Sequence, residues 1–175
     1  GGIFFLASIL NFLPSYADPQ KVLHDAWYTM QAGSTPWGYY HEFFELRENK
    51  YFYRYEMTKR EANYTYNENL GAVALPDLTP VAFNLRKSGH TATEIINGNY
   101  VTAKHGGNMK IEIDGSRKKT LTRSIPKGGL LDSFFPLWIK QHWSELKPGK
   151  KRTLQLFGED AGYADFKTHS TRLEV

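Results

Sequence analysis

The sequence predicts a mainly β protein in which an antiparallel meander forms a curved half-barrel packed around one amphipathic helix, at about residues 130–147. Strand-like segments recur roughly every eight to twelve residues between short turns, which is typical of a meander. After the N-terminus, apolar residues recur at helical spacing only in residues 127–150. A single aromatic helix among many strands requires a sheet curved enough to receive it.

Residues 1–17 are predicted to be a signal peptide that precedes a single domain at residues 18–175. The apolar run at 3–13 is short for a bilayer span, which needs roughly twenty residues. Pro14 ends the run, and the small-x-small pattern of residues 15–17 fits a signal-peptidase site. An initiator Met and a positive n-region are missing, so we expect truncation at the N-terminus. A core element and an uncleaved anchor remain the alternatives to an exported, periplasmic protein.

The chain before the helix divides into strands separated by turn residues. In the third strand, Tyr51, Tyr53 and Tyr55 alternate with residues that are polar apart from Phe52, which predicts one buried and one mostly solvated face. Two prolines make residues 76–80 a rigid connection outside the strands. The expected strands before the helix are 26–32, 39–47, 51–59, 63–66, 72–75, 81–87, 90–96, 99–104, 109–114 and 118–125, and those after it are 151–157 and 163–174.

The turns are predicted from Gly, Asn and Pro. Asn97-Gly98 is the strongest hairpin signal, because a type I′ turn requires positive φ at both central residues. Residues 67–71 contain two Asn and a Gly and predict a bulge or loop. Residues 33–38 and 105–108 predict two further hairpin loops.

The helix has recognisable ends and one apolar face. Asp132 is the expected N-cap, Pro136 is tolerated because it lies in the first turn, and Pro148-Gly149 ends the element. The residues that share the apolar face, spaced three or four apart, are Leu131, Phe134, Phe135, Trp138, His142 and Leu146.

The composition excludes several classes of chemistry. The chain has no cysteine, which excludes a disulfide scaffold, a thiol nucleophile and a cysteine-bound metal. A net charge of +4 is too small to predict nucleic-acid binding, although it allows weak attraction to an anionic membrane surface. No HExxH, GxSxG or usable carboxylate pair is present. We therefore predict no cofactor and no metal site, and an enzyme is the third alternative, after the two non-catalytic functions given below.

The histidines give no active-site pattern. His41, Glu42 and Glu45 form the densest polar cluster, but on a strand His41 and Glu42 project to opposite faces. His41 and Glu45 would lie more than roughly ten ångströms apart along the strand. We therefore expect solvated polar positions there. We expect His142, on the apolar face of the helix, to be partly buried with its hydrogen bonds satisfied.

Several turn and strand-entry signals resemble those of a group of uncharacterised bacterial periplasmic half-barrel proteins, which are similar in fold to the outer-membrane lipoprotein carriers. These signals are Trp27-Tyr28, Gly38-Tyr39, the connection at 77–83, Asn97-Gly98, Ile125-Pro126 and the segment at 148–150. The resemblance covers residues 26–175. It implies an incomplete antiparallel barrel whose concave face is plugged by a helix, with a lipid or acyl-chain binding role. It supplies no catalytic residues.

The candidate ligand-binding residues lie on the helix. Trp138 is placed at mid-helix to cap a cavity, and His142 offers a polar group to orient a head group. The alternative is that the aromatic side chains only pack the core. The complete set of candidates is Phe134, Phe135, Trp138, His142 and Trp143.

These observations predict an exported binding module for an apolar or lipid-like ligand. Flanking Lys147, Lys150 and Arg152 would attract an anionic head group. The alternative is a structural or interaction module of the cell envelope, with an envelope protein as partner and a solid core. An open trough with convergent polar groups favours the first function, and a filled trough favours the second.

Overall fold

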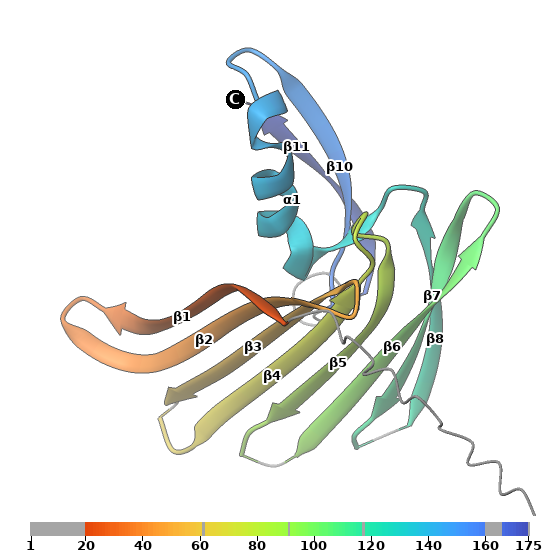
Figure 1. Cartoon of the computed structure of the whole chain (residues 1–175). Coiled ribbons are helices and arrows are strands. Elements are labelled where there is room, and N and C mark those ends of the chain that lie inside the picture. The colour runs from red at the N-terminus through yellow and green to blue at the C-terminus, as the bar shows by residue number, and fades with distance from the viewer. Residues whose placement is uncertain (1–19, 61, 91, 117, 160–165, 175) are drawn as a thin grey trace, which may run out of the picture.

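The computed structural model describes residues 20–174 apart from 61, 91, 117 and 160–165. Its elements are β1 Lys21–Ala32, β2 Thr35–Arg47, β3 Lys50–Arg60, β4 Thr65–Ala74, β5 Pro80–Ser88, β6 Thr93–Ala103, β7 Gly106–Asp114, β8 Lys119–Pro126, β9 Leu130–Leu131, α1 Phe135–His142, β10 Lys151–Phe157 and β11 Thr168–Glu174. Strands β1 to β8 form one antiparallel sheet in sequence order, and β11, β10 and β9 form a second, smaller sheet. The large sheet is curved and open, because β1 and β8 are its edges (Figure 1). The predicted mainly β, half-barrel-like fold with one helix is confirmed.

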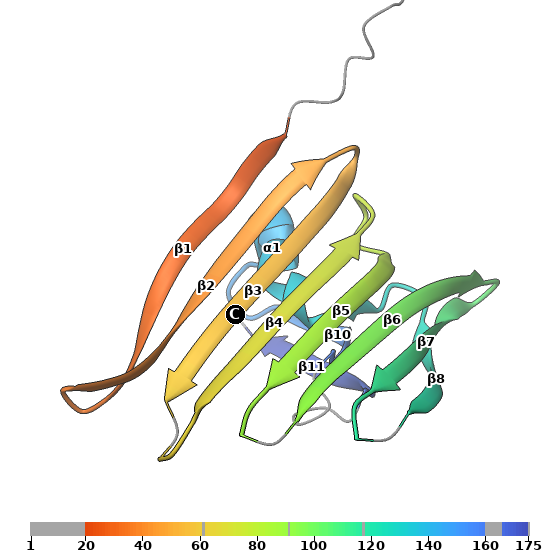
Figure 2. The same cartoon turned by 90° about the horizontal axis from the view of Figure 1, so that it is seen from below.

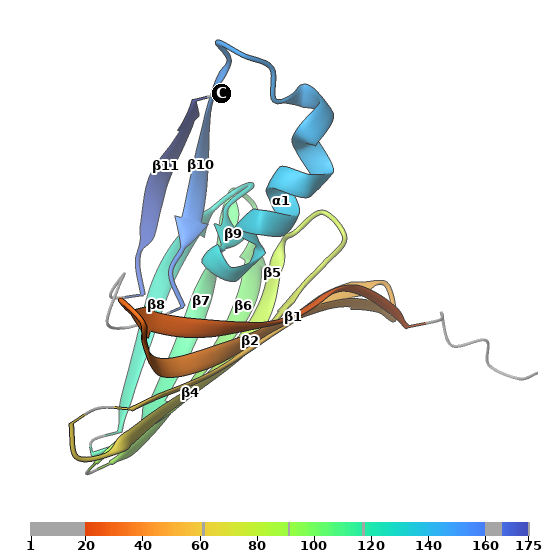
Figure 3. The same cartoon turned by 90° about the vertical axis from the view of Figure 1, so that its left-hand side faces the viewer.

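The two faces of the large sheet have different surroundings. The helix α1 and the small sheet lie together over one face, which we call the inner face (Figures 1 and 3). Figure 2 shows the opposite, outer face, which none of the described helices or strands covers. The inner face therefore forms the core, and the outer face is open to solvent or to a ligand.

The helical segment spans residues 132–145, slightly less than predicted. A 3-10 turn, Asp132–Phe134, leads into α1, and a second one, Trp143–Glu145, follows it. Pro136 lies at the start of α1, where its missing N–H is tolerated. The prediction that Asp132 is the N-cap is wrong, because neither helix start has a side-chain cap. The parallel pairing of Leu131 with β10 keeps the chain extended up to that residue, so the helical segment begins directly after it.

The Asn97-Gly98 pair lies inside β6, so the hairpin predicted there is wrong. Gly98 pairs with Phe83 of β5 on one side and with Ile111 of β7 on the other. The ring of Phe83 occupies the space that a Cβ at residue 98 would need. Glycine is therefore required by close packing against an aromatic ring and not by a turn conformation.

Three other predicted turns also differ from the structure, because the strands extend farther than their sequences indicate. The bulge predicted at 67–71 is wrong, because β4 runs unbroken through these residues and pairs with both β3 and β5. The turn predicted at 105–108 is shorter, since β7 begins at Gly106. The first hairpin is longer than predicted, because β1 begins at Lys21 and β2 at Thr35.

The core is a cross-strand row of inner-face residues, covered by aromatic side chains of the helical segment, of β10 and of the connection from β10 to β11. Phe134, Phe157 and Phe166 are fully buried or nearly so. Each such ring stabilises the fold by roughly 1.5–3 kcal/mol through burial alone. The row consists of Phe44, Tyr53, Ala72, Phe83, Gly98, Ile111 and Leu121, each paired with the next across the strands.

Candidate functional site

Phe134, the first aromatic candidate, lies in the core and not in an open trough. It is 0% exposed, and its ring packs edge-on against Phe44 and Tyr53, with centroids 6.1 and 6.4 Å away. These partners come from β2 and β3 on the inner face. Below the helix start, the trough is therefore filled by side chains of the protein itself.

The remaining helix candidates are more accessible. Trp138 and Phe135 are half-buried against the core, whereas Trp143 is 71% exposed. The ring of His142 stacks on that of Trp138 with centroids 4.3 Å apart. Its Nδ1–H donates a hydrogen bond of 2.9 Å to the Trp138 carbonyl, so the predicted satisfied, partly buried histidine is confirmed. This pair forms a rigid aromatic surface near the end of α1.

An apolar pocket of about 260 Å³ lies between α1 and the β1–β2 edge of the sheet, and we call it the trough-mouth pocket. None of the five predicted binding residues is among the described residues that line this pocket, and α1 contributes other residues to it. The sequence interpretation missed Leu137, although it lies three residues after Phe134, because it followed the four-residue spacing to Trp138. The pocket is lined by Leu23, His24, Tyr28, Glu42, Phe44, Pro136, Leu137 and Lys140.

The polar groups of the trough-mouth pocket are held by hydrogen bonds. The Tyr53 hydroxyl donates to the Glu42 carboxylate over 3.1 Å. Burial, and then the neighbouring Glu42, raise the pKa of the Tyr53 hydroxyl, which therefore remains protonated as a donor. Tyr28 and His24 share a hydrogen bond of 3.3 Å between the hydroxyl and Nε2. Glu42, His24 and the exposed Lys140 thus give the pocket a polar rim.

A buried carboxylate anchors the start of the helical segment. Glu159 follows β10, is 3% exposed, and accepts hydrogen bonds from the Ser133 hydroxyl and, over 3.4 Å, from the Ser133 backbone N–H. Burial raises the pKa of Glu159 to about 7, against the lowering effect of the Ser133 hydrogen bonds. Burial also raises the pKa of Asp132 beside it. The hydrogen bonds between Ser133 and Glu159 therefore connect the start of the helical segment to the chain that follows β10.

The prediction that His41 is a solvated position is wrong. Only 8% of the residue is exposed, because side chains of the neighbouring strand β1 pack against it. The Trp27 ring stacks on the imidazole with centroids 4.3 Å apart, and His41 Nε2–H donates to Asp25 Oδ1 over 2.7 Å. His41 and Glu45 lie on the same face of β2 but bind different partners. The histidine is therefore a packing element of the first hairpin.

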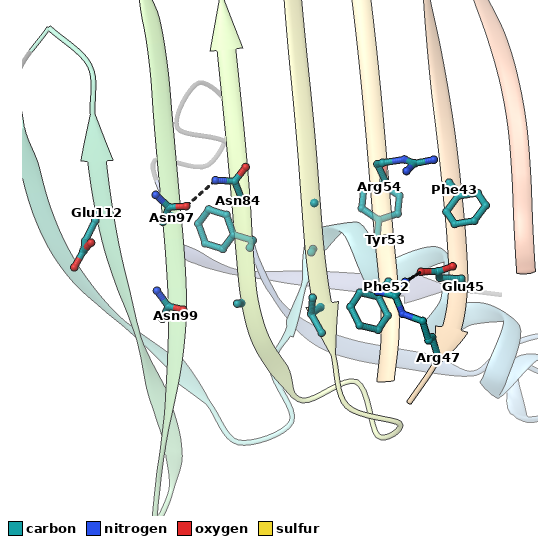
Figure 4. Close-up of a pocket in the computed structure, with 15 residues that line it drawn as sticks. Phe43, Glu45, Arg47, Phe52, Tyr53, Arg54, Asn84, Asn97, Asn99 and Glu112 are labelled. Carbon is teal, nitrogen blue, oxygen red and sulfur yellow. Dashed lines mark hydrogen bonds and ion pairs between the residues drawn. The ribbon is translucent and has the colours of Figure 1, made fainter. Parts of the chain in front are cut away.

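A groove of about 680 Å³ crosses the outer face from β2 to β7, and we call it the outer-face groove (Figure 4). Its floor is low because Gly71, Val73 and Ala82 have short side chains or none. The sequence interpretation missed it, since its residues come together only through the register of six strands. One wall consists of Asn84, Asn97, Asn99 and Glu112.

The other wall of the outer-face groove carries two arginines fixed over aromatic rings. The Arg47 guanidinium lies 4.5 Å above the Phe52 ring, and that of Arg54 lies 5.0 Å above the Phe43 ring. Such contacts are worth roughly 0.5–1 kcal/mol at exposed sites. Arg47 also pairs with the buried Glu45 at 3.4 Å, as Figure 4 shows. The wall is therefore ordered before any ligand arrives.

Comparisons of the chain with protein-family models, with curated proteins and with solved structures found no match. The likeness to lipoprotein carriers therefore stays a prediction from the sequence. Among the residues that the structure describes, no helix has the length and apolar character needed to cross a membrane. Within the same residues, His, Asp and Glu side chains form no cluster of three or more that could hold a metal ion.

Proposed function

We propose that the protein is a binding module for an apolar or lipid-like ligand whose apolar part enters the trough-mouth pocket. The pocket itself supports this proposal, because its interior is apolar and its polar groups lie at the rim. Its volume of about 260 Å³ is small. Typical small-molecule sites measure roughly 300–1,000 Å³. The pocket therefore takes the end of one acyl chain or a single ring and not a whole lipid.

The rim supports an anionic head group in this proposal. Lys140 of α1 supplies a positive charge on the helix side, and Tyr28 and His24 supply hydrogen-bonding groups on the β1 side. The Glu42 carboxylate of the rim already accepts a hydrogen bond from the Tyr53 hydroxyl, so the head group would lie toward Lys140 and away from Glu42. The attraction of Lys140 should weaken with salt, because surface charges are screened. Trp138, His142 and Trp143 remain candidates along the accessible part of the helix. Phe134 and Phe135 would act by holding that helix in place.

The test is a titration with the fluorescent fatty acid dansyl undecanoic acid, whose fluorescence reports binding. The variant Leu23→Trp places a larger side chain of β1 in the pocket. We expect binding to wild type and at least about a tenfold weaker affinity for the variant, equivalent to about 1.4 kcal/mol. Val22→Trp is the matched control, because Val22 is exposed and pairs with Glu45 on β2. Trp138→Leu tests the aromatic surface of the helix in the same assay, alongside its urea midpoint. If wild type binds neither this probe nor phospholipid, the binding proposal is wrong.

A structural or interaction module of the cell envelope is the second candidate. The filled core around Phe134 favours it, because little of the trough is left open. Exposed aromatic side chains on the first hairpin also suit a protein partner, since such residues are enriched at interfaces. Trp27 is 63% exposed and has Tyr39 beside it, and Trp37 is also exposed on β2. The fatty-acid titration separates the two candidates.

We also propose that the protein is exported to the periplasm. The support is the apolar run and the small-x-small pattern of residues 1–17, which lie outside the described residues. The intact mass of the protein recovered from the exported fraction should match a chain that begins at Asp18. Retention of residues 1–17 in that fraction would contradict the proposal.

A further inference from the structure

Gly71 forms part of the floor of the outer-face groove, although nothing in the described structure requires glycine there. It lies inside β4 and pairs with Arg54 and Asn84 on the two neighbouring strands. Its φ lies outside the left-handed region, and no described atom beyond residues 70–72 lies within 4 Å of the position that a Cβ would take. Glycine in a strand interior is destabilising by roughly 0.5–1 kcal/mol relative to alanine. Such a glycine often marks a place where a ligand approaches the backbone.

We propose that the outer-face groove binds an uncharged, polyhydroxylated chain of the oligosaccharide class. The flat floor of Gly71, Val73 and Ala82 receives the C–H face of a sugar ring. The walls supply the hydrogen bonds. This site is on the opposite face of the sheet from the trough-mouth pocket, so the proposal does not rest on apolar binding there.

The charges of the groove favour a neutral ligand over an anion. Two guanidinium groups and two carboxylates line it, so their formal charges cancel. Arg47 already pairs with Glu45 at 3.4 Å, and Arg54 pairs with Glu56 at 3.5 Å. An anionic ligand would have to compete with these carboxylates. A hydroxyl group can instead donate to a carboxylate and accept from a guanidinium.

The amide wall is arranged for the same chemistry. Asn84 Nδ2–H donates to Asn97 Oδ1 over 2.6 Å, which fixes both side chains (Figure 4). This bond leaves the Asn84 oxygen as an acceptor and the Asn97 amide as a donor side by side. Neighbouring hydroxyls of a sugar ring need such an acceptor and donor. Asn99 repeats the amide two positions farther along β6, on the same face.

The register extends these groups into a path across the sheet. Arg54, Gly71, Asn84, Asn97 and Glu112 are consecutive cross-strand partners from β3 to β7. Neighbouring strands lie about 4.8 Å apart. That spacing is similar to the length of one pyranose unit in an extended chain. A short oligosaccharide that crosses the strands would therefore contact one polar side chain at nearly every sugar. At β4 it would contact the open backbone of Gly71, between Arg54 and Asn84.

The test is a titration of the full-length, nitrogen-15-labelled protein with cellohexaose, chitohexaose and maltohexaose, followed by amide chemical shifts. We expect at least one of these neutral sugars to cause saturable shifts that cluster on β3 to β7. Absence of such shifts for all three sugars would overturn the proposal. Salt-sensitive binding of a sulfated hexasaccharide, with none of the neutral sugars, would also overturn it and would assign the groove to anions.

Two valine substitutions on one strand provide the matched comparison. Gly71→Val fills the floor and should weaken sugar binding at least about tenfold. Its thermal midpoint should be unchanged or higher, because valine suits a strand, so lost binding cannot be attributed to unfolding. Asn69→Val is the control, since residue 69 lies on the same face of β4 but outside the groove. Equal binding by the Gly71 and Asn69 variants would overturn the assignment.

Discussion

The two faces of the large sheet each contain a glycine in the middle of a paired strand, and the space above the two glycines differs. On the inner face, the ring of Phe83 fills the space above Gly98. On the outer face, no described atom lies within 4 Å of the Cβ position of Gly71. Both residues pair with a strand on each side. Pairing alone therefore does not explain either glycine.

This difference shows that a glycine inside a strand can have either of two roles. It can make room for a neighbouring side chain, or it can leave the backbone accessible to a ligand. In the middle of the inner row, Phe83 pairs with Ala72 on one side and Gly98 on the other, and its ring occupies the space that a side chain at residue 98 would need. The outer row has no second layer of described elements to fill its gap, and the result is a groove. The predictions below test whether the inner face is filled and the outer face open.

Removal of a buried ring from the inner face should have the largest effect. Phe134→Ala should lower the free energy of unfolding by about 3–5 kcal/mol, because Phe134 is 0% exposed and close-packed. The urea midpoint measures this change, and Trp143→Ala on the same helical segment is the control. Trp143 is 71% exposed, so its loss should change stability by about 0.5 kcal/mol or less. Equal effects of the two variants would show that the inner face is not a filled core.

The inner face should also make stability depend on pH through Glu159. Its pKa is raised from 4.5 to about 7, so the folded protein binds the proton more tightly than the unfolded chain. This contribution is fully present below pH 4.5 and is lost as the pH rises to about 7. At about 1.4 kcal/mol per pKa unit, the loss amounts to at most about 3.5 kcal/mol.

Urea midpoints measured from pH 4.5 to 8 should detect this decrease. Glu159→Gln keeps the shape of the side chain but cannot ionise, so its midpoint should vary less with pH than that of wild type. A wild-type midpoint that rises steadily across this range would contradict the role of Glu159. Burial also raises the pKa of the neighbouring Asp132, so this group contributes a dependence in the same direction in both proteins.

A single methyl group on the inner glycine should have a moderate effect. Gly98→Ala places its Cβ against the Phe83 ring, which must move within a packed core. Overpacking of this kind costs about 1–3 kcal/mol. The thermal midpoint of the variant should therefore fall. Gly98→Ala with Phe83→Leu should recover part of the loss, because the smaller side chain leaves room for the methyl group, and failure to recover would place the strain elsewhere.

The sequence predicts the elements well because strand alternation and helical spacing are local. The third strand and its buried tyrosine face follow from residues 51–59, and the helix follows from the spacing of its apolar residues. The Asn97-Gly98 turn was predicted wrongly because its explanation is Phe83 on a different strand. His41 was predicted wrongly because its burial depends on the register that places Trp27 of β1 opposite it, and this register has no local signal in the sequence.

The candidate sites are less predictable than the fold, because they depend on pairing between distant segments. Helical spacing indicates that Phe134 and Trp138 face inward, but whether they meet a cavity depends on β2 and β3. The outer-face groove depends on the register that places Gly71 between Arg54 and Asn84. A single sequence contains no direct signal of that register, so Asn69 and Gly71 suggest a loop as readily as a strand.

The smallest expected effect is the opposite of the one at Gly98. Gly71→Ala should raise the free energy of unfolding by about 0.4–1 kcal/mol, because alanine reduces the freedom of the unfolded chain and its methyl group meets no described atom. The same substitution thus lowers stability on one face and raises it on the other. Paired thermal melts of the two alanine variants measure this change of sign. A loss of stability in Gly71→Ala would mean that the outer face is already filled and that the groove is not open to a ligand.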